Sequence, residues 1–197
     1  MVYGVGFVGF GKYKVKINGK ATAEYSAWDS MLRRCYSSKS KAERPTYTGC
    51  TVCDEWHYFQ TFAEWFTNAR RSDHHNLQLD KDLLSPGNKI YSPETCVLIP
   101  RNLNLFTIGR DSLRGEFPIG TCFNKKLGRF VAYCSHEGRT IHLGCFDDPI
   151  SAHNAWYKKK VDLAYNFKNI CDEIHPNLFE GVLAKIESMH LTNTKTN

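Results

Sequence analysis

The sequence has 197 residues, of which 42% are hydrophobic and 13% aromatic. This much apolar material excludes a wholly disordered chain and suffices for one large domain or two small ones. The net charge is +6, no run of about 18 apolar residues predicts a membrane span, and the N-terminus lacks a signal-peptide pattern. We therefore expect a cytoplasmic protein whose eight cysteines are reduced or bind metal, rather than forming disulfides.

Charge is unevenly distributed along the chain. Lys and Arg outnumber Asp and Glu by nine to three in residues 1–48 and by eight to four in residues 117–168. In residues 49–116 the carboxylates are in excess, by nine to seven. Cations bind phosphates and carboxylates bind divalent metals, so this alternation is compatible with a protein that acts on nucleic acid.

The first segment in chain order is a Gly-rich lead-in. Residues 2–17 mix Gly with Val, Phe and Tyr and end at Asn18-Gly19, a dipeptide that favours a β-hairpin turn. A Gly-x-Gly-x-x-Gly spacing begins at Gly4 and matches a dinucleotide-binding fingerprint. We reject that interpretation, because no strand precedes the spacing and no amphipathic helix directly follows it.

Residues 24–36 predict a helix with Ser26 as its N-cap, because apolar residues recur at three- and four-residue spacing. The apolar face is expected to contain Trp28, Met31, Leu32 and Cys35. Arg33 and Arg34 fall outside this face and are either solvated charges or contacts to DNA phosphates. Residues 37–49 are polar and predict a loop.

Residues 54–69 predict a second helix whose aromatic face packs in a core. That face is expected to contain Trp56, Phe59, Phe62, Ala63 and Phe66. After a polar connector, residues 79–84 and 96–99 predict two short strands separated by turns. Residues 101–108 then predict a short helix, so the order is strand, loop, strand, helix.

This strand–loop–strand–helix segment is where a metal site for phosphodiester hydrolysis could lie. Asp80 and Asp82 alternate along the predicted strand, so they would share one face and could hold a hard cation such as Mg²⁺. Asn102 or Asn104 on the next helix could complete the coordination. Alternatively, the two carboxylates are surface groups paired with neighbouring lysines such as Lys81.

The segment LDKDLLSPGNKIYSPETCVLIP, preceded by CTVCDEW, resembles the HNH (His-Me finger) endonuclease-like proteins that are common in bacteriophage genomes. The helix containing MLRRCY also resembles the N-terminal region of that family. The resemblance covers roughly residues 25–110 and implies a ββα-metal nuclease fold. It implies that Asp80 is a metal ligand, that Asn88 is the loop asparagine, and that Asn104 is the ligand on the helix.

One departure from the HNH pattern concerns the general base. The family usually has a His beside the metal ligand, whereas Lys81 stands here. A Lys with an ordinary pKa is protonated at neutral pH and cannot accept a proton without strong desolvation. His75, or its neighbour His74, could supply an imidazole instead, although both could equally be exposed loop residues.

Four cysteines could form a second metal site. Cys50 and Cys53 have the spacing of zinc ligands, and Cys35 and Cys96 could complete a four-thiolate structural Zn²⁺ site. A free Cys also packs well on an apolar helix face, as expected for Cys35, so buried thiols without metal are the alternative.

After a polar linker at 109–117, the sequence predicts a three-stranded sheet and a helix. The strands are expected at 119–123, 129–134 and 140–146. Asp148-Pro149 is expected to open a helix over 150–165, because Asp can cap a helix and Pro suits its first turn. The inner face of that helix is expected to contain Ala152, Ala155, Trp156 and Leu163, with Lys158, Lys159 and Lys160 solvated.

Strand alternation divides the side chains of this sheet between two faces. The residues expected to face the helix are Phe130, Ala132, Cys134, Ile141 and Leu143, and those expected to face away are Arg129, Val131, Tyr133, Thr140 and His142. Lys125, Lys126 and Arg139 lie in the adjoining turns. The outward face is therefore a basic surface suited to DNA phosphates and base edges, with an ordinary polar sheet face as the alternative.

The stretch PIGTCFNKKLGRFVAYCSHEGRTIHLGCFDDPISAHNAWYKK resembles the AP2 DNA-binding domain. The resemblance rests on IGTCF, GRFVAY and HLGCFDDPISAHNAWY and covers nearly all of residues 117–165. It implies a three-stranded sheet that lies in a DNA groove with the helix packed behind it. Plant AP2 domains have Trp at the position of His142 and an acidic residue at that of Tyr133, so their sequence preference does not transfer.

We therefore expect an α+β protein with an HNH-like nuclease domain over 1–110, an AP2-like domain over 117–168, and a C-terminal helix (178–189) and tail within 169–197. The expected function is that of a metal-dependent DNA endonuclease of the phage homing or nicking type, in the host cytoplasm if a phage encodes it. Its expected partner is double-stranded DNA, and no membrane association is expected. The alternatives are a catalytically inactive DNA-binding regulator and a host-interaction protein on the same scaffold.

Overall fold

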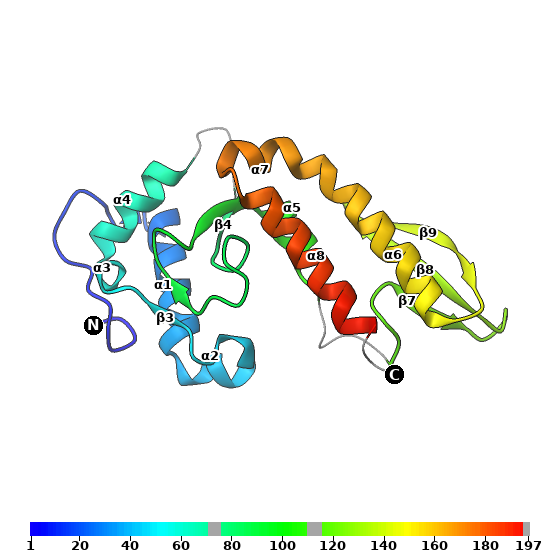
Figure 1. Cartoon of the computed structure of the whole chain (residues 1–197). Coiled ribbons are helices and arrows are strands. Elements are labelled where there is room, and N and C mark those ends of the chain that lie inside the picture. Colours follow the sequence, from blue (N-terminus) through cyan, green and yellow to red (C-terminus); the bar gives the residue numbers. More distant parts are fainter. Residues whose placement is uncertain (71–75, 110–115, 195–197) are drawn as a thin grey trace. The chain divides into compact units, whose positions relative to one another are not determined.

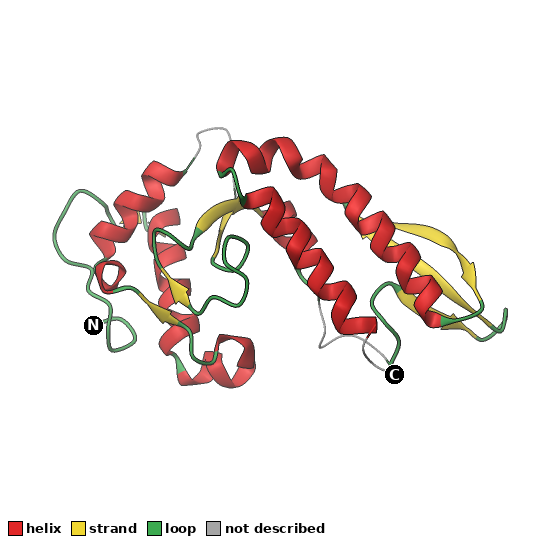
Figure 2. Cartoon of the chain, viewed as in Figure 1, coloured by secondary structure: helices red, strands yellow, loops and turns green. Residues whose placement is uncertain are grey.

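The computed structural model describes residues 1–70, 76–109 and 116–194. Most of the predicted linker and the end of the predicted tail lie outside these ranges. The chain forms two compact units, Met1–Arg101 and Asn102–Asn197 (Figure 1). Each unit combines helices with β-strands, which confirms the mixed α+β class (Figure 2). Within the described ranges, no helix is long and apolar enough to cross a membrane.

The first unit is built on two packed helices, α1 (Ala23–Tyr36) and α4 (Phe59–Ala69). Both predicted apolar faces are confirmed, since the four residues named for the first helix and the five for the second are all buried. The indole of Trp28 on α1 donates a hydrogen bond to the carbonyl of Trp56, 2.7 Å away, in the turn of chain just before α4. The core of this unit is therefore largely aromatic.

The N-cap of α1 differs from the prediction. Thr22, not Ser26, is the cap, and its Oγ1 accepts a hydrogen bond from the Tyr25 amide. Ser26 already lies in the first turn, where its hydroxyl donates to the Thr22 carbonyl. Both residue types cap helices well, so the sequence alone did not separate them.

The expected loop at 37–49 also contains regular structure. A short helix, α2 (Ser38–Glu43), and the 3₁₀ turn η1 (Pro45–Tyr47) fill most of it. The Ser37 hydroxyl caps α2 by accepting from the Ser40 amide. The helix is one and a half turns long and buries no residue, so it has none of the apolar periodicity by which helices are recognised in sequences.

The single helix expected over 54–69 is interrupted at Tyr58. Helix α3 (Asp54–His57) ends there, and α4 begins at the next residue. The break is held by Phe7, whose amide donates to the His57 carbonyl and whose carbonyl accepts from the Phe59 amide. The N-terminal segment therefore pairs with the chain at the point where the helix would otherwise continue.

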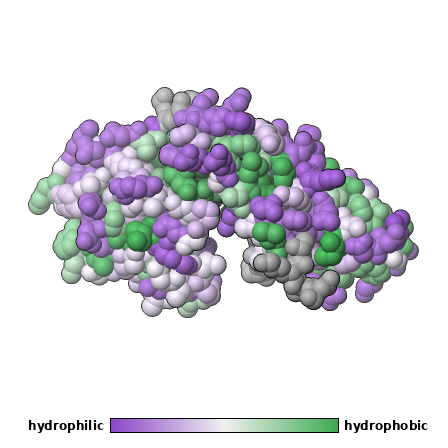
Figure 3. All heavy atoms as spheres, viewed as in Figure 1, coloured by the Kyte–Doolittle hydropathy of each residue, from purple (hydrophilic) through white to green (hydrophobic). Residues whose placement is uncertain are grey.

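A hairpin follows the N-terminal segment. Strands β1 (Lys16–Ile17) and β2 (Lys20–Ala21) pair around Asn18-Gly19, whose φ angles of +50° and +77° fit the turn predicted from this dipeptide. Before the hairpin, Phe7 and Phe10 are exposed. Hydrophobic atoms are visible at the left edge of Figure 3, where Figure 1 places this segment.

Two pairs of short strands complete the first unit. Strand β3 (Thr51–Val52) pairs in parallel with β5 (Ile90–Tyr91), and β4 (Leu77–Asp80) pairs antiparallel with β6 (Val97–Pro100). Helix α5 (Arg101–Thr107) follows β6 directly, and all of it after Arg101 belongs to the second unit. The two predicted strands and the predicted helix are thus observed, but the additional short strand β5 interrupts the segment that was expected to contain only turns.

The second unit contains the predicted three-stranded antiparallel sheet. Its strands are β7 (Thr121–Asn124), β8 (Arg129–His136) and β9 (Arg139–Phe146), in the order β7-β8-β9. The sheet packs against α6 (Pro149–Ala164), which is capped as predicted by Asp148. In Figure 1, α6 lies between the sheet and α8 (Leu178–Thr194).

The C-terminal part of the second unit is more helical than expected. A 3₁₀ turn, η3 (Tyr165–Phe167), and α7 (Lys168–Ile174) connect α6 to α8. Helix α8 runs to Thr194 rather than ending at 189. Residues Leu178, Val182 and Ile186 of α8 are fully buried, so this helix is part of the packed unit.

Gly120 determines how closely the sheet approaches α6. It has φ +82°, and a Cβ at this position would lie 2.2 Å from Cγ of Trp156 on the helix. Its carbonyl accepts a hydrogen bond from the Tyr133 amide, 2.8 Å away. Only glycine combines this backbone conformation with the close approach of the indole ring.

Replacing Gly120 with Ala tests this packing. The loss should combine about 1–2 kcal/mol for the left-handed backbone with about 1–3 kcal/mol for the clash with Trp156. Gly128→Ala is the control, because Gly128 also has positive φ but has no atom within 4 Å of the added Cβ. Urea denaturation should show a clearly larger loss for Gly120→Ala, and equal losses would contradict the packing.

Candidate functional site

The β7–β9 sheet carries the predicted DNA-binding side chains, one of which, Tyr133, also lines the cavity beside Trp156 of α6. Arg129, Tyr133, Thr140 and His142 are all exposed. Tyr133 on β8 pairs directly with His142 on β9, and their rings meet edge to face with centroids 5.4 Å apart. The structure thus brings together two of the residues that alternation placed on the outward face.

Val131 does not have the exposure that the same prediction implies. It was expected to face outward with Arg129 and Tyr133, but only 2% of its surface is exposed. It lies on the central strand and pairs with Cys122 on one side and Cys145 on the other. Val131 is therefore not accessible to a ligand.

A register shift bends the sheet next to Tyr133. Ala132 pairs with Gly144 while Tyr133 pairs with His142, so β9 has one extra residue, Leu143, at this point. A bulge of this kind increases the local twist of a strand pair. Beyond it, Ser135 lies opposite Thr140 and is exposed on the same face. Ser135 was missed because the predicted strand ended two residues too early.

Cations surround this face at both of its turns. Lys125 and Lys126 are exposed in the β7–β8 turn, and Arg139 is exposed at the start of β9. The Asn124 side chain fixes the first turn, because its Oδ1 accepts from the amides of Lys126 and Leu127 at 3.0 and 3.2 Å. The two lysines are thus presented from a turn of defined shape.

Arg129 forms an ion pair with Asp147 on this surface. Its Nη2 lies 2.9 Å from Oδ1 of Asp147, and both side chains are exposed. Exposed pairs of this kind contribute only about 0–1 kcal/mol. Arg129 can therefore exchange Asp147 for a phosphate at little cost.

The candidate metal ligand Asp80 stands at the end of β4. Its Oδ1 accepts hydrogen bonds from the amides of Asp82 and Leu83, at 2.9 and 2.8 Å. These bonds form a turn and end the strand four residues before the predicted limit. The prediction that Asp80 and Asp82 share a strand face is therefore wrong, because Asp82 lies in the turn. Burial raises the pKa of Asp80, and the two amide bonds oppose this.

Lys81 and Asn88 hold the loop that follows Asp80. Lys81 is only 5% exposed, and its Nζ donates to the Asp82 carboxylate and, over 2.7 Å, to the Asn88 carbonyl. The Asn88 amide donates to the carbonyls of Lys81 and Ile90 and accepts from the Ile90 amide. Through these two hydrogen bonds Lys81 helps to shape the loop.

The structure does not place the remaining predicted ligands relative to Asp80. Asn102 and Asn104 are on the part of α5 that belongs to the second unit, whereas Asp80 belongs to the first. Asn102 accepts a hydrogen bond from the Leu103 amide. His75 and its neighbour His74 lie outside the described residues.

The four cysteines of the predicted zinc site are free thiols. Among the described residues, no three His, Cys, Asp or Glu side chains are grouped so that they could hold a metal ion. Burial raises the pKa of Cys35 and Cys96 to about 12 and that of Cys53 to about 11, and Cys50 is also buried. The described residues therefore give the zinc prediction no support, and Cys35, Cys50 and Cys96 are packed in the core while Cys53 is partly buried.

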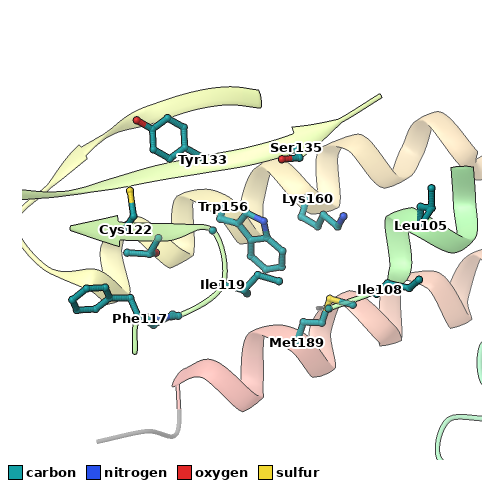
Figure 4. Close-up of a pocket in the computed structure, with 14 residues that line it drawn as sticks. Leu105, Ile108, Phe117, Ile119, Cys122, Tyr133, Ser135, Trp156, Lys160 and Met189 are labelled. Atoms are coloured by element: carbon teal, nitrogen blue, oxygen red, sulfur yellow. The ribbon is translucent and has the colours of Figure 1, made fainter. Parts of the chain in front are cut away.

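The prediction for Lys160 was also wrong. It was expected to be solvated with Lys158 and Lys159, but only 8% of its surface is exposed. Its Nζ lies 3.5 Å from the centroid of the Phe106 ring, and desolvation lowers its pKa to about 8. Lys160 lines a cavity of about 550 Å³ in the second unit, where Figure 4 shows it beside Trp156 on the inner side of the sheet.

Comparison with known proteins found no matching family model, no matching curated protein and no matching solved structure. The candidate sites are therefore argued from their geometry and from the residue motifs alone.

The loop after Asp80 gives a prediction about stability. Asn88→Ala removes three hydrogen bonds made by the side chain, so the free energy of unfolding should fall by about 2–4 kcal/mol. Asn154→Ala is the control, because Asn154 is exposed on α6 and Ala favours a helix. Urea denaturation measures both, and a loss below about 0.5 kcal/mol for Asn88→Ala would show that the loop does not depend on this side chain.

Proposed function

We propose that this protein binds double-stranded DNA through the outer face of the β7–β9 sheet. The observation that supports the proposal is the exposed Tyr133–His142 ring pair, with cations at the turns on either side of it. The AP2 resemblance of the same residues points to the same face. An ordinary polar sheet face would account for the solvated charges but gives no reason for the two exposed rings.

The side chains of this face divide into two chemical roles. Lys125, Lys126 and Arg139 would contact phosphates, which fixes the position of the protein on DNA without reading its sequence. Tyr133 and His142 offer hydrogen-bonding and stacking groups that suit base edges. Thr140 and Ser135 add hydroxyl donors beside them.

The support behind the face also suits recognition. The inner side of the sheet is packed on α6, and the turn at Glu137-Gly138 has the positive φ angles of a tight hairpin. A face held in this way loses little conformational entropy on binding. The sheet therefore presents its side chains in a nearly fixed arrangement.

Two sets of substitutions test these roles on the full chain. Lys125→Gln/Lys126→Gln should weaken binding to all sequences alike and lower the salt dependence by about 0.9 per lost phosphate contact. Tyr133→Ala and His142→Ala should each cost about 1–3 kcal/mol and relax sequence preference. Fluorescence anisotropy with duplex DNA at two salt concentrations measures both.

The control for these substitutions is Lys158→Gln, because Lys158 is exposed on α6, on the other side of the sheet. Its affinity for DNA should stay close to that of the unaltered chain. Binding that survives all the sheet substitutions unchanged would exclude this face as the DNA-binding surface.

A second candidate function is metal-dependent phosphodiester hydrolysis by an HNH-type endonuclease. The observation that favours it is Asp80, a desolvated carboxyl at the end of β4, which pairs with the strand β6 that directly precedes α5. Carboxyls with raised pKa values are frequent in functional sites. In this proposal Asp80 would bind Mg²⁺ or a similar ion, and His75 would accept a proton from water. The ion would neutralise charge on the scissile phosphate.

Asp80→Asn tests this second candidate. The Asn oxygen can still accept both backbone hydrogen bonds, so the chain should fold. Because burial raises the pKa of Asp80, the ionised carboxylate destabilises the fold at neutral pH. The variant should therefore be at least as stable at pH 7, and any gain should shrink as the pH falls towards the ordinary pKa of Asp.

Cleavage of phage and host DNA with Mg²⁺ or Mn²⁺ provides the functional measurement. The unaltered chain should cut or nick DNA, and Asp80→Asn should abolish this. Undiminished cleavage by the variant would exclude Asp80 as the metal ligand. No cleavage by the unaltered chain, with DNA binding retained, would instead favour a DNA-binding regulator without catalytic activity.

A further inference from the structure

A cavity of about 300 Å³ lies in the first unit, beside the end of α1 and along α2. It is lined by Arg33, Arg34, Ser37, Lys39, Ser40, Glu43 and Arg44. Four of the seven side chains are cations, two are hydroxyls and one is a carboxylate. We call this cavity the basic hollow.

The cations of the basic hollow are open to a ligand. Arg33, Lys39 and Arg44 are exposed, and within the described residues none of them has a carboxylate at ion-pair distance. Arg34 is more buried and lies against the Tyr47 ring, 5.7 Å from its centroid. Arg34 therefore has a fixed position, while the other three can adjust to a bound group.

The position of Arg33 and Arg34 has a simpler explanation. Both lie in the last turn of α1, where positive charge stabilises the helix dipole. This explanation does not extend to Lys39 or Arg44, because they come from α2 and the residue that follows it. Like charges gathered around one cavity repel one another, and a bound anion would remove that repulsion.

The polar groups of the hollow suit a phosphate in particular. The Ser37 oxygen accepts a hydrogen bond from the Ser40 amide at 3.3 Å, which leaves the Ser37 hydroxyl hydrogen free to donate to a ligand. Arg and Lys supply further charge-assisted donors. No aromatic or amide side chain lines the cavity, so it contains little that could read a base.

We propose that the basic hollow binds a phosphate of the DNA backbone, independently of sequence. This inference rests on the proposed function and deepens it, because it gives the first unit its own contact with the DNA that the β7–β9 sheet holds. Arg33 and Arg34 are then two members of a site whose other cations, Lys39 and Arg44, come from the next helix.

The first experiment measures whether the basic hollow binds phosphate in the absence of DNA. The full chain is titrated separately with inorganic phosphate and with dimethyl phosphate, a diester like the DNA backbone, while NMR follows the amides of residues 37–44. Saturable shifts are expected in the unaltered chain and should be lost in Lys39→Gln/Arg44→Gln. Arg34 is left unchanged because it packs against Tyr47.

The second experiment measures duplex DNA binding over a range of salt concentrations. Lys39→Gln/Arg44→Gln should lower the salt-dependence slope by about 1.8, or 0.9 for each of two phosphate contacts. The affinity should fall equally for all DNA sequences. Lys158→Gln/Lys185→Gln is the matched control, since it removes the same charge from two exposed positions in the second unit.

The outcomes separate this inference from the proposed function. If the hollow variant equals the control in slope and the amides of residues 37–44 do not respond to either phosphate, the hollow is not a phosphate site. If the sheet substitutions abolish DNA binding while the hollow variant does not alter it, only the hollow is contradicted. If the amides respond to phosphate but the chain binds no DNA, the phosphate that the hollow binds does not belong to DNA. The proposed function is then wrong as well.

Discussion

The contact between Trp156 and the backbone of Gly120 is the constraint on which the second unit depends. It brings the sheet close to α6. At the same residue, the Gly120 carbonyl accepts a hydrogen bond from the Tyr133 amide. One face of the sheet is thereby committed to the core, where Ala132 and Cys134 are buried. Arg129, Tyr133, Thr140 and His142 remain exposed on the sheet, held in a defined register, which is the property that DNA recognition by a sheet requires.

The first unit shows a different relation between polar groups and structure. Asp80 and Asn88, to which the HNH resemblance gives site roles, and Lys81, which stands where that family has His, all make hydrogen bonds within one loop. These bonds shape the segment between β4 and β5. A loop so bonded can serve as a rigid support for a metal ligand, or can remain after activity is lost, and both possibilities are compatible with DNA binding by the sheet.

Much of the fold could be predicted where the amphipathic pattern was strong, as in α1, α4, α6 and the β7–β9 sheet. The errors came from interactions that a pattern does not contain. Lys160 reads as part of a charged face, but Phe106 from a distant segment covers it. Asp82 reads as a strand residue, but the Asp80 side chain bonds to its amide and turns the chain. Of the cations in the basic hollow, only Arg33 and Arg34 were predicted as phosphate contacts. Lys39 and Arg44 were missed because α2 has no apolar periodicity and was not predicted.

The most direct test of the central claim is to map the DNA contact on the full chain by NMR. On addition of a duplex, amide and side-chain signals of Arg129, Tyr133, Thr140 and His142 should shift together. Signals from buried residues of α8, such as Ile186, should stay in place. Shifts confined to α7 and α8, or no shifts on the sheet at a concentration where DNA is bound, would contradict the claim that this face holds the DNA.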